Sequence, residues 1–446
     1  MPVPAPQRRQ RPSRSAAAAA HQLVHPFWRR NISRRAFLAS SLQAGAAVAL
    51  GTAAAGSLAG CSDNNATASS GSQVTLSDGT SVAILSARTD QLLEVTEFNE
   101  ATNLADYLVE AVRYELPYGT IFYQMDNDRV LALIPSGSGR SLIRFEQLDL
   151  NNGTRIRLLD TAVGLSAERP AAILYDARCS TDLLLWTECD VSDLSWQVYT
   201  AQLTNGSVGG PVLVDEGSAD MEIPLLAVAG DKAYWTVMPN PGGPAQYNDS
   251  YLKMAGAGSS DVQIVYTSHG RMCTTPLVDQ GVLTFVPRVD TKNIYYQLTA
   301  LDTASNQIQY AAVMPQSVRV LDALALEGNF CFSLEDNYSY ASGLGFYGTY
   351  QPLANADRWL HLARKPSAAP VILRDRLVVK SALRVIGIDA ANQFYYSIPP
   401  LSGSADYGDI LAGWGHQERL VIYSNVNTGL NLDTAKGILR VFTPVD

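Results

Sequence analysis

A short apolar strand recurs along this 446-residue sequence at intervals close to fifty residues. Its seven copies are residues 131–135, 183–187, 233–237, 283–287, 330–334, 394–398 and 439–443. The steps between their first residues are 52, 50, 50, 47, 64 and 45. A strand repeat of this period is typical of proteins whose small sheets are arranged around an axis, and it is too regular for an ordinary sandwich.

The neighbours of each copy complete a four-stranded unit. Around residues 183–187, a strand at 173–175 precedes the copy, an alternating strand at 196–203 follows it, and a further strand lies at 211–214. Inner strands that pack on both faces are apolar throughout, whereas outer strands facing water on one side alternate. The pattern predicts an all-β protein, a β-propeller of seven four-stranded blades, with six or eight left open.

The last copy ends near Asp446, so its blade lacks outer strands in the sequence that follows. Exposed sheet edges invite pairing with other chains, so we expect strands from both termini to close the ring. The hairpin at residues 73–85 is the predicted donor of the missing strands. Residues 86–117 are expected to form a loop or helix that covers one face, with 104–116 as the sole candidate helix.

The N-terminal segment contains two export motifs. Ser33-Arg34-Arg35-Ala36-Phe37-Leu38 resembles the twin-arginine consensus, and Leu58-Ala59-Gly60-Cys61 resembles the lipobox of bacterial lipoproteins. The resemblance implies cleavage before Cys61 and lipidation of its sulfur, with an uncleaved signal anchor as the alternative. We therefore expect a signal at 1–60, a flexible tether at 61–72 and a single propeller domain at 73–446. The domain would lie outside the cytoplasm, anchored to the cell membrane.

Tandem blades behind an export leader resemble the TolB-like propeller proteins of the bacterial envelope. The likeness covers about residues 73–446 and is one of architecture, because no specific family motif is present. It implies the propeller fold and does not carry over the partners of TolB, which is not lipidated.

Charge restricts the partners. The formal net charge is −9, but residues 1–60 hold eight of the 33 basic residues and none of the 42 acidic ones. The remainder therefore carries 25 bases against 42 acids, a net charge of −17. A surface with this negative charge repels phosphate backbones, and we therefore expect no nucleic-acid partner.

Catalytic signatures are absent from the sequence: there is no nucleophile elbow, zinc-protease motif, phosphate loop or calcium loop. After the leader, the histidines are His269, His361 and His416, and no serine stands out as a triad partner. We expect no cofactor and no metal, and we leave enzymatic activity uncertain, leaning to none. Among the cysteines, Cys189 and Cys273 on neighbouring blades are the one pair considered for a disulfide.

Candidate binding residues lie on one predicted face. The loops between second and third strands and the links between blades share this face, here called the loop face. An insert from Glu335 to Arg358 interleaves aromatic rings with Gly and Ser and accounts for the 64-residue step. Its rings either bind a ligand or pack on the propeller. The candidate ligand-binding residues are Tyr338, Tyr340, Phe346, Tyr347, Tyr350, Glu188, Asp190 and Asp215.

The acidic members of this set leave three possibilities: a solvated rim, a site for a cation or basic peptide, and paired carboxylates for glycoside hydrolysis. The predicted function is a membrane-tethered module that binds a glycan, a peptide or an envelope protein at its loop face. The alternatives are a propeller glycosidase or lyase, and a scaffold subunit of an envelope complex.

Overall fold

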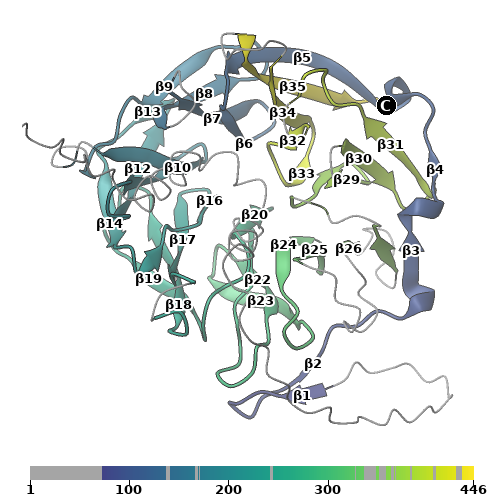
Figure 1. The fold of residues 1–446 in the computed structure, drawn as a ribbon, viewed down its shortest axis with the longest axis horizontal. Coiled ribbons are helices and arrows are strands. Elements are labelled where there is room, and N and C mark those ends of the chain that lie inside the picture. The colour runs from purple at the N-terminus through teal and green to yellow at the C-terminus, as the bar shows by residue number, and fades with distance from the viewer. Residues whose placement is uncertain are drawn as a thin grey trace, which may run out of the picture.

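The computed structural model describes residues 73–446 apart from 137–140, 166–168, 170, 242–244, 327, 336–347, 351–357, 363–365, 367, 382–383, 405–407, 428–433 and 446. The regular structure of this part is β-strand, apart from 3-10 turns at Thr89–Gln91, Val95–Glu97 and Leu104–Asp106. The strands form small antiparallel sheets around a central axis (Figure 1). The chain is an all-β propeller, as predicted. None of the described helices has the length and apolarity to span a membrane.

The described strands are here divided by their pairing into groups of four, called blades one to seven, although one pair, Leu174 opposite Leu142, joins blades one and two into a single sheet. Blade one is β6 (Ile121–Gln124), β7 (Arg129–Pro135), β8 (Leu142–Asp149) and β9 (Arg155–Leu159). Blade two is β10 (Ala172–Cys179), β11 (Leu183–Asp190), β12 (Trp196–Thr204) and β14 (Val212–Gly217), with β13 (Ser207–Val208) on the end of β12. Blade three is β16 (Leu226–Ala229), β17 (Lys232–Pro239), β18 (Ser250–Gly256) and β19 (Gln263–Ser268), with β15 (Met221–Glu222) on the end of β17.

The remaining blades follow the same order from the channel outwards. Blade four is β20 (Leu277–Asp279), β21 (Val282–Phe285), β22 (Gln297–Asp302) and β23 (Gln307–Val313). Blade five is β24 (Val320–Leu326), β25 (Asn329–Leu334), β26 (Gly348–Tyr350) and β27 (Trp359–His361). Blade six is β28 (Val371–Leu373), β29 (Arg376–Ser381), β30 (Arg384–Asp389) and β31 (Phe394–Ile398). Blade seven is β32 (Ile410–Leu411), β34 (Leu420–Val426), β35 (Lys436–Pro444) and β5 (Leu108–Pro117).

Burial follows the position of a strand in its blade. All eight residues of β11, a second strand, are buried, because blades pack against both of its faces. The outer strand β9 exposes Arg155, Ile156 and Arg157 and buries Leu158. The contrast between apolar inner strands and half-exposed outer strands, read from the sequence, thus holds in the fold.

The last two copies of the sequence repeat were assigned to the wrong strands. Residues 394–398 form the outer strand β31 and residues 439–443 lie in the third strand β35, whereas the second strands of these blades are β29 and β34. Since β25 begins at residue 329 and β29 at 376, the 64-residue step disappears. The insert at 335–358 is therefore not needed to explain that step, and its residues Gly348–Tyr350 form β26.

The ring is closed by strands from both termini, but the N-terminal donor is β5 and not the hairpin. β5 pairs antiparallel with β35 from Leu108 opposite Pro444 to Pro117 opposite Lys436. The hairpin of β1 (Gln73–Thr75) and β2 (Ser81–Ala83) forms a separate two-stranded sheet. The expected loop or helix at 86–117 is therefore wrong, because much of this segment pairs as strands.

Residues 84–117, here called the belt, run along the outside of four blades (Figure 1). Ile84 bridges Val313 of blade four, β3 (Leu92–Glu94) pairs parallel with β27, and β4 (Asn99–Glu100) pairs parallel with β31. The belt then becomes β5 on blade seven. It covers sheet edges that would otherwise expose unpaired backbone groups.

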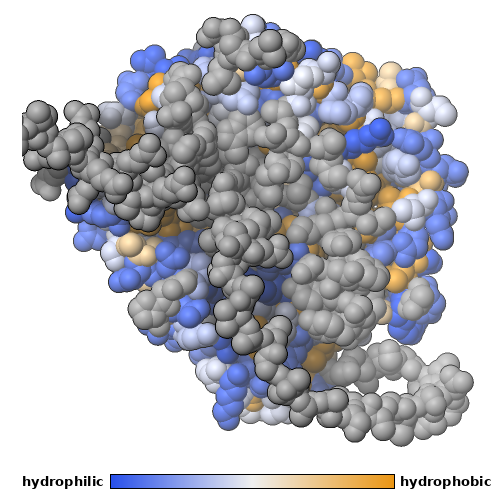
Figure 2. Space-filling model, viewed as in Figure 1, coloured by the Kyte–Doolittle hydropathy of each residue, from blue (hydrophilic) through white to orange (hydrophobic). Residues whose placement is uncertain are grey.

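The other outer strands, on blades one to three, have a different protection. Their pairs with the third strands each contain a register irregularity, which bends an edge away from further pairing. The large apolar side chains exposed on them are scattered, with one each at Ile156, Leu213 and Ile264. In Figure 2, hydrophilic residues cover most of the coloured rim and the hydrophobic ones are dispersed.

Candidate functional site

The loop between the first and second strands of blade seven, residues 412–419, reaches across one end of the channel. Its segment β33 (Gly415–Gln417) pairs parallel with β28 on the channel side of blade six. Both ends of the loop are bonded to Gln124 of blade one. The backbone N–H of Gln124 donates to the backbone oxygen of Ala412 at 2.8 Å, and its side-chain amide donates to the backbone oxygen of Arg419 at 3.4 Å. This end of the propeller, formed by the turns between first and second strands, is here called the turn face.

The same loop is clamped to blade four, on the far side of the channel. The indole N–H of Trp414 donates to the backbone oxygen of Val278 at 2.9 Å. One carboxylate oxygen of Asp279 accepts the backbone N–H of His416 at 2.9 Å, and the other lies 2.8 Å from His416 Nδ1. Gly415 has φ +67, and a Cβ there would lie 2.4 Å from the Asp279 carboxylate, so glycine is required.

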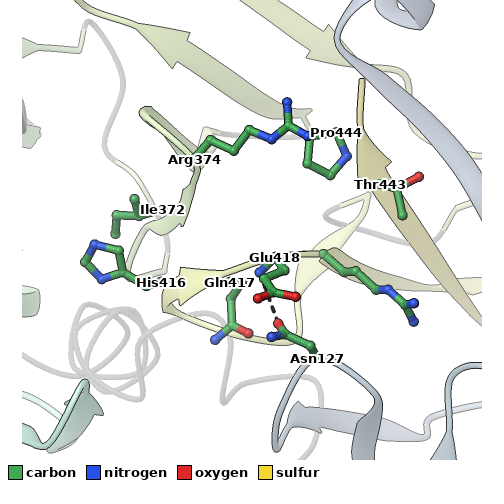
Figure 3. A pocket seen from close by; sticks show the side chains of 9 residues that line it. Asn127, Ile372, Arg374, His416, Gln417, Glu418, Thr443 and Pro444 are labelled. Atoms are coloured by element: carbon green, nitrogen blue, oxygen red, sulfur yellow. Dashed lines mark hydrogen bonds between the residues drawn. The ribbon is translucent and has the colours of Figure 1, made fainter. Parts of the chain in front are cut away.

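A pocket of about 640 Å³ opens beside this loop (Figure 3). Its lining comes from blades one, six and seven: Asn127, Ile372, Arg374, His416, Gln417, Glu418, Arg419, Thr443 and Pro444. Its volume falls within the roughly 300–1,000 Å³ of known ligand sites. Because the pocket lies on the turn face, it is at the opposite end of the propeller from the predicted loop-face site.

The pocket lining carries both signs of charge on opposite sides. Arg374 lies with Pro444 on one side, and Glu418 lies with Gln417 and Asn127 on the other (Figure 3). The Arg374 guanidinium donates to the backbone oxygen of Val445 at 2.8 Å. Such a site suits polar, charged ligands better than apolar ones.

The acidic candidates of the loop face are engaged in holding the propeller together. Glu188 is fully buried, and its carboxylate accepts the backbone N–H groups of Val163, Gly164 and Leu165 at 2.6–3.2 Å and the indole N–H of Trp186 at 3.1 Å. Four N–H donors compensate the cost of burying this charge and fix the link between blades one and two.

Asp190 and Asp215 are also bonded within the protein. Asp190 is buried and caps its own turn through the N–H and hydroxyl of Ser192 at 2.8 and 2.6 Å. Asp215 accepts from the Trp235 indole at 2.7 Å and from the Lys253 ammonium at 2.9 Å, which ties blade two to blade three. Glu188, Asp190 and Asp215 do not line the turn-face pocket, and their role in ligand binding at the loop face remains a prediction.

The aromatic candidates fall mostly outside the described residues. Tyr338, Tyr340, Phe346 and Tyr347 lie in 336–347. For Tyr350 the backbone is described: it pairs in β26 with Cys331 and Leu360. Their role as ligand contacts remains a prediction.

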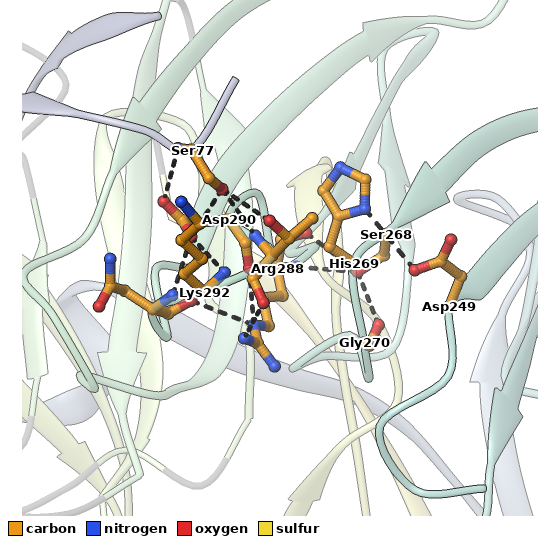
Figure 4. Close-up of polar contacts among 10 residues, drawn as sticks. Ser77, Asp249, Ser268, His269, Gly270, Arg288, Asp290 and Lys292 are labelled. Carbon is orange, nitrogen blue, oxygen red and sulfur yellow. Dashed lines mark hydrogen bonds and ion pairs between the residues drawn. The ribbon is translucent and has the colours of Figure 1, made fainter. Parts of the chain in front are cut away.

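The three histidines after the leader each lie beside a carboxylate and lie on different blades. His269 Nδ1 is 3.6 Å from Asp249, whereas His361 Nδ1 is 2.7 Å from Glu94 on the belt. Ser268, next to His269, donates its hydroxyl to the backbone oxygen of Gly270 at 2.8 Å, so this trio is not arranged as a triad (Figure 4). Within the described residues, no group of three metal-ligating side chains is found.

Figure 4 also shows how the hairpin is attached to blade four. The buried Asp290 carboxylate accepts the backbone N–H and hydroxyl of Ser77, both at 3.0 Å. Burial acts to raise the pKa of Asp290, but hydrogen bonds from the backbone N–H groups of Asn293 and Lys292 and from Ser77 lower it to about 2.

A buried charge network joins blades six and seven near the loop face. Arg440 donates to Asp409 at 3.1 Å and to Glu110 of β5 at 3.1 Å. Burial lowers the pKa of Lys380 to about 8, against the opposing effect of the Asp409 charge. Burial also raises the pKa of Asp409, against the opposing effect of Arg440. The network holds a strand from each terminus and blade six in one unit.

Cys179, Cys189, Cys273 and Cys331 are buried free thiols, so Cys189 and Cys273 are not bonded to each other. Burial raises the pKa of Cys179 to about 12 and that of Cys331 still further, which makes both thiols unreactive.

Sequence reasoning did not select the pocket residues. Arg374, Glu418, Arg419 and Asn127 all lie in turns between first and second strands, a feature that is visible once the strands are assigned correctly. His416 is one of the three histidines named from the sequence, but its partner Asp279 is 137 residues away.

No protein-family model matches the sequence, and no curated protein matches it. Among solved structures, the chain is similar to one in a mitotic checkpoint complex at 7% identity and TM-score 0.45, covering 78% of this chain and 96% of that one. A prolyl endopeptidase matches at 13% identity and TM-score 0.43 over 72% of this chain, which spans 45% of that enzyme. The Dos1 propeller matches at 10% identity and TM-score 0.40, covering 70% of this chain and 76% of that one.

Proposed function

We propose that this chain is a membrane-tethered extracytoplasmic lipoprotein whose propeller binds a small polar ligand in the turn-face pocket. The observation that carries the proposal is the pocket itself: about 640 Å³, lined by charged and amide side chains from three blades. The twin-arginine motif at Arg34 and Arg35 and the lipobox at Cys61 support export and lipid anchoring.

The composition of the pocket favours binding over catalysis. Glycoside hydrolysis by the usual route needs two carboxylates flanking the scissile bond, and the lining contributes one, Glu418. Covalent catalysis needs an activated nucleophile, and the one hydroxyl of the lining, that of Thr443, has no hydrogen bond to a base among the described residues. His416 is directed to Asp279 and serves the clamp across the channel.

The binding half of the proposal is tested with the purified full chain. Thermal shifts are measured against a panel of amino acids, dipeptides, organic phosphates and disaccharides, and hits are quantified by calorimetry. We expect Arg374→Gln to weaken binding of a hit at least tenfold. Arg157→Gln, which removes the same charge from an exposed outer-strand position, serves as control.

A second set of variants separates the two faces. Replacing Tyr338, Tyr340, Tyr347 and Tyr350 by Ala tests the predicted loop-face site. Binding that is lost with these changes and unaffected by Arg374→Gln would move the ligand to the loop face and contradict the proposal.

The anchoring half is tested by cell fractionation and by mass measurement of the mature N-terminus. We expect the wild-type chain to sediment with membranes and to begin at a lipidated Cys61, and Cys61→Ala to remain as a non-lipidated precursor. Replacing Arg34 and Arg35 by Lys should leave the protein inside the cell. A mature protein without lipid would refute the anchor.

A further inference from the structure

We infer that the ligand of the turn-face pocket carries both a carboxylate and an ammonium group, as a free dipeptide or tripeptide does. The inference rests on the proposed function of that pocket and adds the chemical class of the ligand. It follows from the placement of Arg374 and Glu418 on opposite sides of one pocket (Figure 3).

The cationic side is built around Arg374. Its hydrogen bond to the Val445 backbone oxygen, at 2.8 Å, holds the guanidinium at the pocket, and the planar fork of such a group matches a carboxylate. Arg374 has φ 57, in the left-handed region, as Gln280 has in the corresponding turn of blade four.

The anionic side is built around Glu418. Its backbone N–H donates to the Asn127 side-chain oxygen at 3.0 Å, which fixes the residue at the pocket. Among the described residues, no cation lies within ion-pair distance of its carboxylate, whereas the neighbouring Arg419 pairs with Asp128 at 3.6 Å. An exposed carboxylate in this position attracts an ammonium group and repels a second anion.

The remaining lining of the pocket suits a short peptide. The amides of Asn127 and Gln417 offer donors and acceptors to peptide groups, while Ile372 and Pro444 offer apolar surface. A ligand with phosphates alone would place its charge against Glu418, so the mixed lining disfavours it.

Calorimetry on the purified full chain tests the inference with four probes: alanyl-alanine, N-acetyl-alanyl-alanine, alanyl-alanine amide and maltose. We expect alanyl-alanine to bind at least tenfold more tightly than either blocked peptide, since each blocked form loses one charge contact. Maltose is expected not to bind.

Two variants assign the contacts. Arg374→Gln should lower the affinity for alanyl-alanine to that of the amide and leave the amide unaffected. Glu418→Gln should lower it to that of the acetylated peptide and leave that peptide unaffected. Both positions are exposed, so neither change is expected to unfold the chain, and the Arg157→Gln control should bind as wild type.

The outcomes separate the inference from the proposed function. Equal binding of free and blocked peptides, or binding of maltose alone that Arg374→Gln abolishes, would overturn the peptide inference and leave the pocket as the binding site. Binding of any probe that neither pocket variant changes would overturn both. Absence of binding by all four probes would also overturn the inference, and the wider panel would then decide the proposed function.

Discussion

We expect Arg440→Met to destabilise the propeller by about 3–5 kcal/mol, the usual cost of removing one partner from a buried ion pair. The Arg440 side chain is 5% exposed and that of its partner Asp409 is 1% exposed. Arg440 also bonds Glu110 of β5 and, at 3.3 Å, the backbone oxygen of Pro399. Methionine keeps an apolar stem but also loses the contact of the guanidinium with the Phe442 ring, whose centroid lies 4.8 Å from Arg440 Cζ.

The free energy of unfolding is measured by urea denaturation at pH 7, with Lys436→Met as the control. Lys436 pairs with Glu115 on the same two strands, but these side chains are 51% and 59% exposed. Exposed pairs contribute about 0–1 kcal/mol, so the control should lose little. Arg440→Met combined with Asp409→Leu should recover only part of the loss, because it removes the isolated Asp409 charge but leaves the buried Lys380 without its balancing charge. Equal losses below about 1 kcal/mol in both single variants would refute the role of Arg440 in closing the ring.

Three further changes test other parts of the fold. Because its folded pKa is depressed to about 2, Asp290 contributes stability that is present above about pH 4 and lost as the pH falls towards 2; Asp290→Asn should abolish this dependence in acid unfolding and speed proteolysis of the hairpin. The pKa of Lys380 is lowered from 10.5 to about 8 in the folded chain, so between these pH values the unfolded chain binds more protons. The free energy of unfolding of the wild type should therefore rise by up to about 3 kcal/mol from pH 8 to 10.5. Lys380→Met should lack this rise in urea titrations. Glu188→Gln should cost at least about 2 kcal/mol in urea denaturation, because the amide cannot accept all four N–H groups; a neutral result would contradict its structural role.

The predictable part of the fold is the part set by burial on both faces of a strand. The second strands β7, β11, β17 and β21 are mostly apolar, and the sequence alone locates them. The sequence pattern did not identify β29 as a second strand, because Lys380 interrupts its apolar run, although the Lys380 side chain is buried. The charge that balances Lys380 comes from Asp409, 29 positions later, and no local pattern reveals such a partner.

The candidate site could not be predicted from the sequence for a similar reason. Its lining comes from turns of three blades and from the end of β35, and each turn is unremarkable by itself. What creates the pocket is the loop at 412–419, held over the channel by Asp279 and β28. Contacts of this kind form only because the closed ring brings distant residues together, so no local motif in the sequence reveals them.

The closing strand, in contrast, was predictable from length. β35 has nine residues, and an edge of that length needs a partner of similar length. β5 has ten residues, whereas the strands of the hairpin have three each. In β5, Val112, Tyr114 and Leu116 alternate with the exposed Arg113 and Glu115, the period of two that marks a half-buried strand and not a helix. Matching the length and period of the unpaired edge therefore selects residues 108–117, because the hairpin could cover only a third of it.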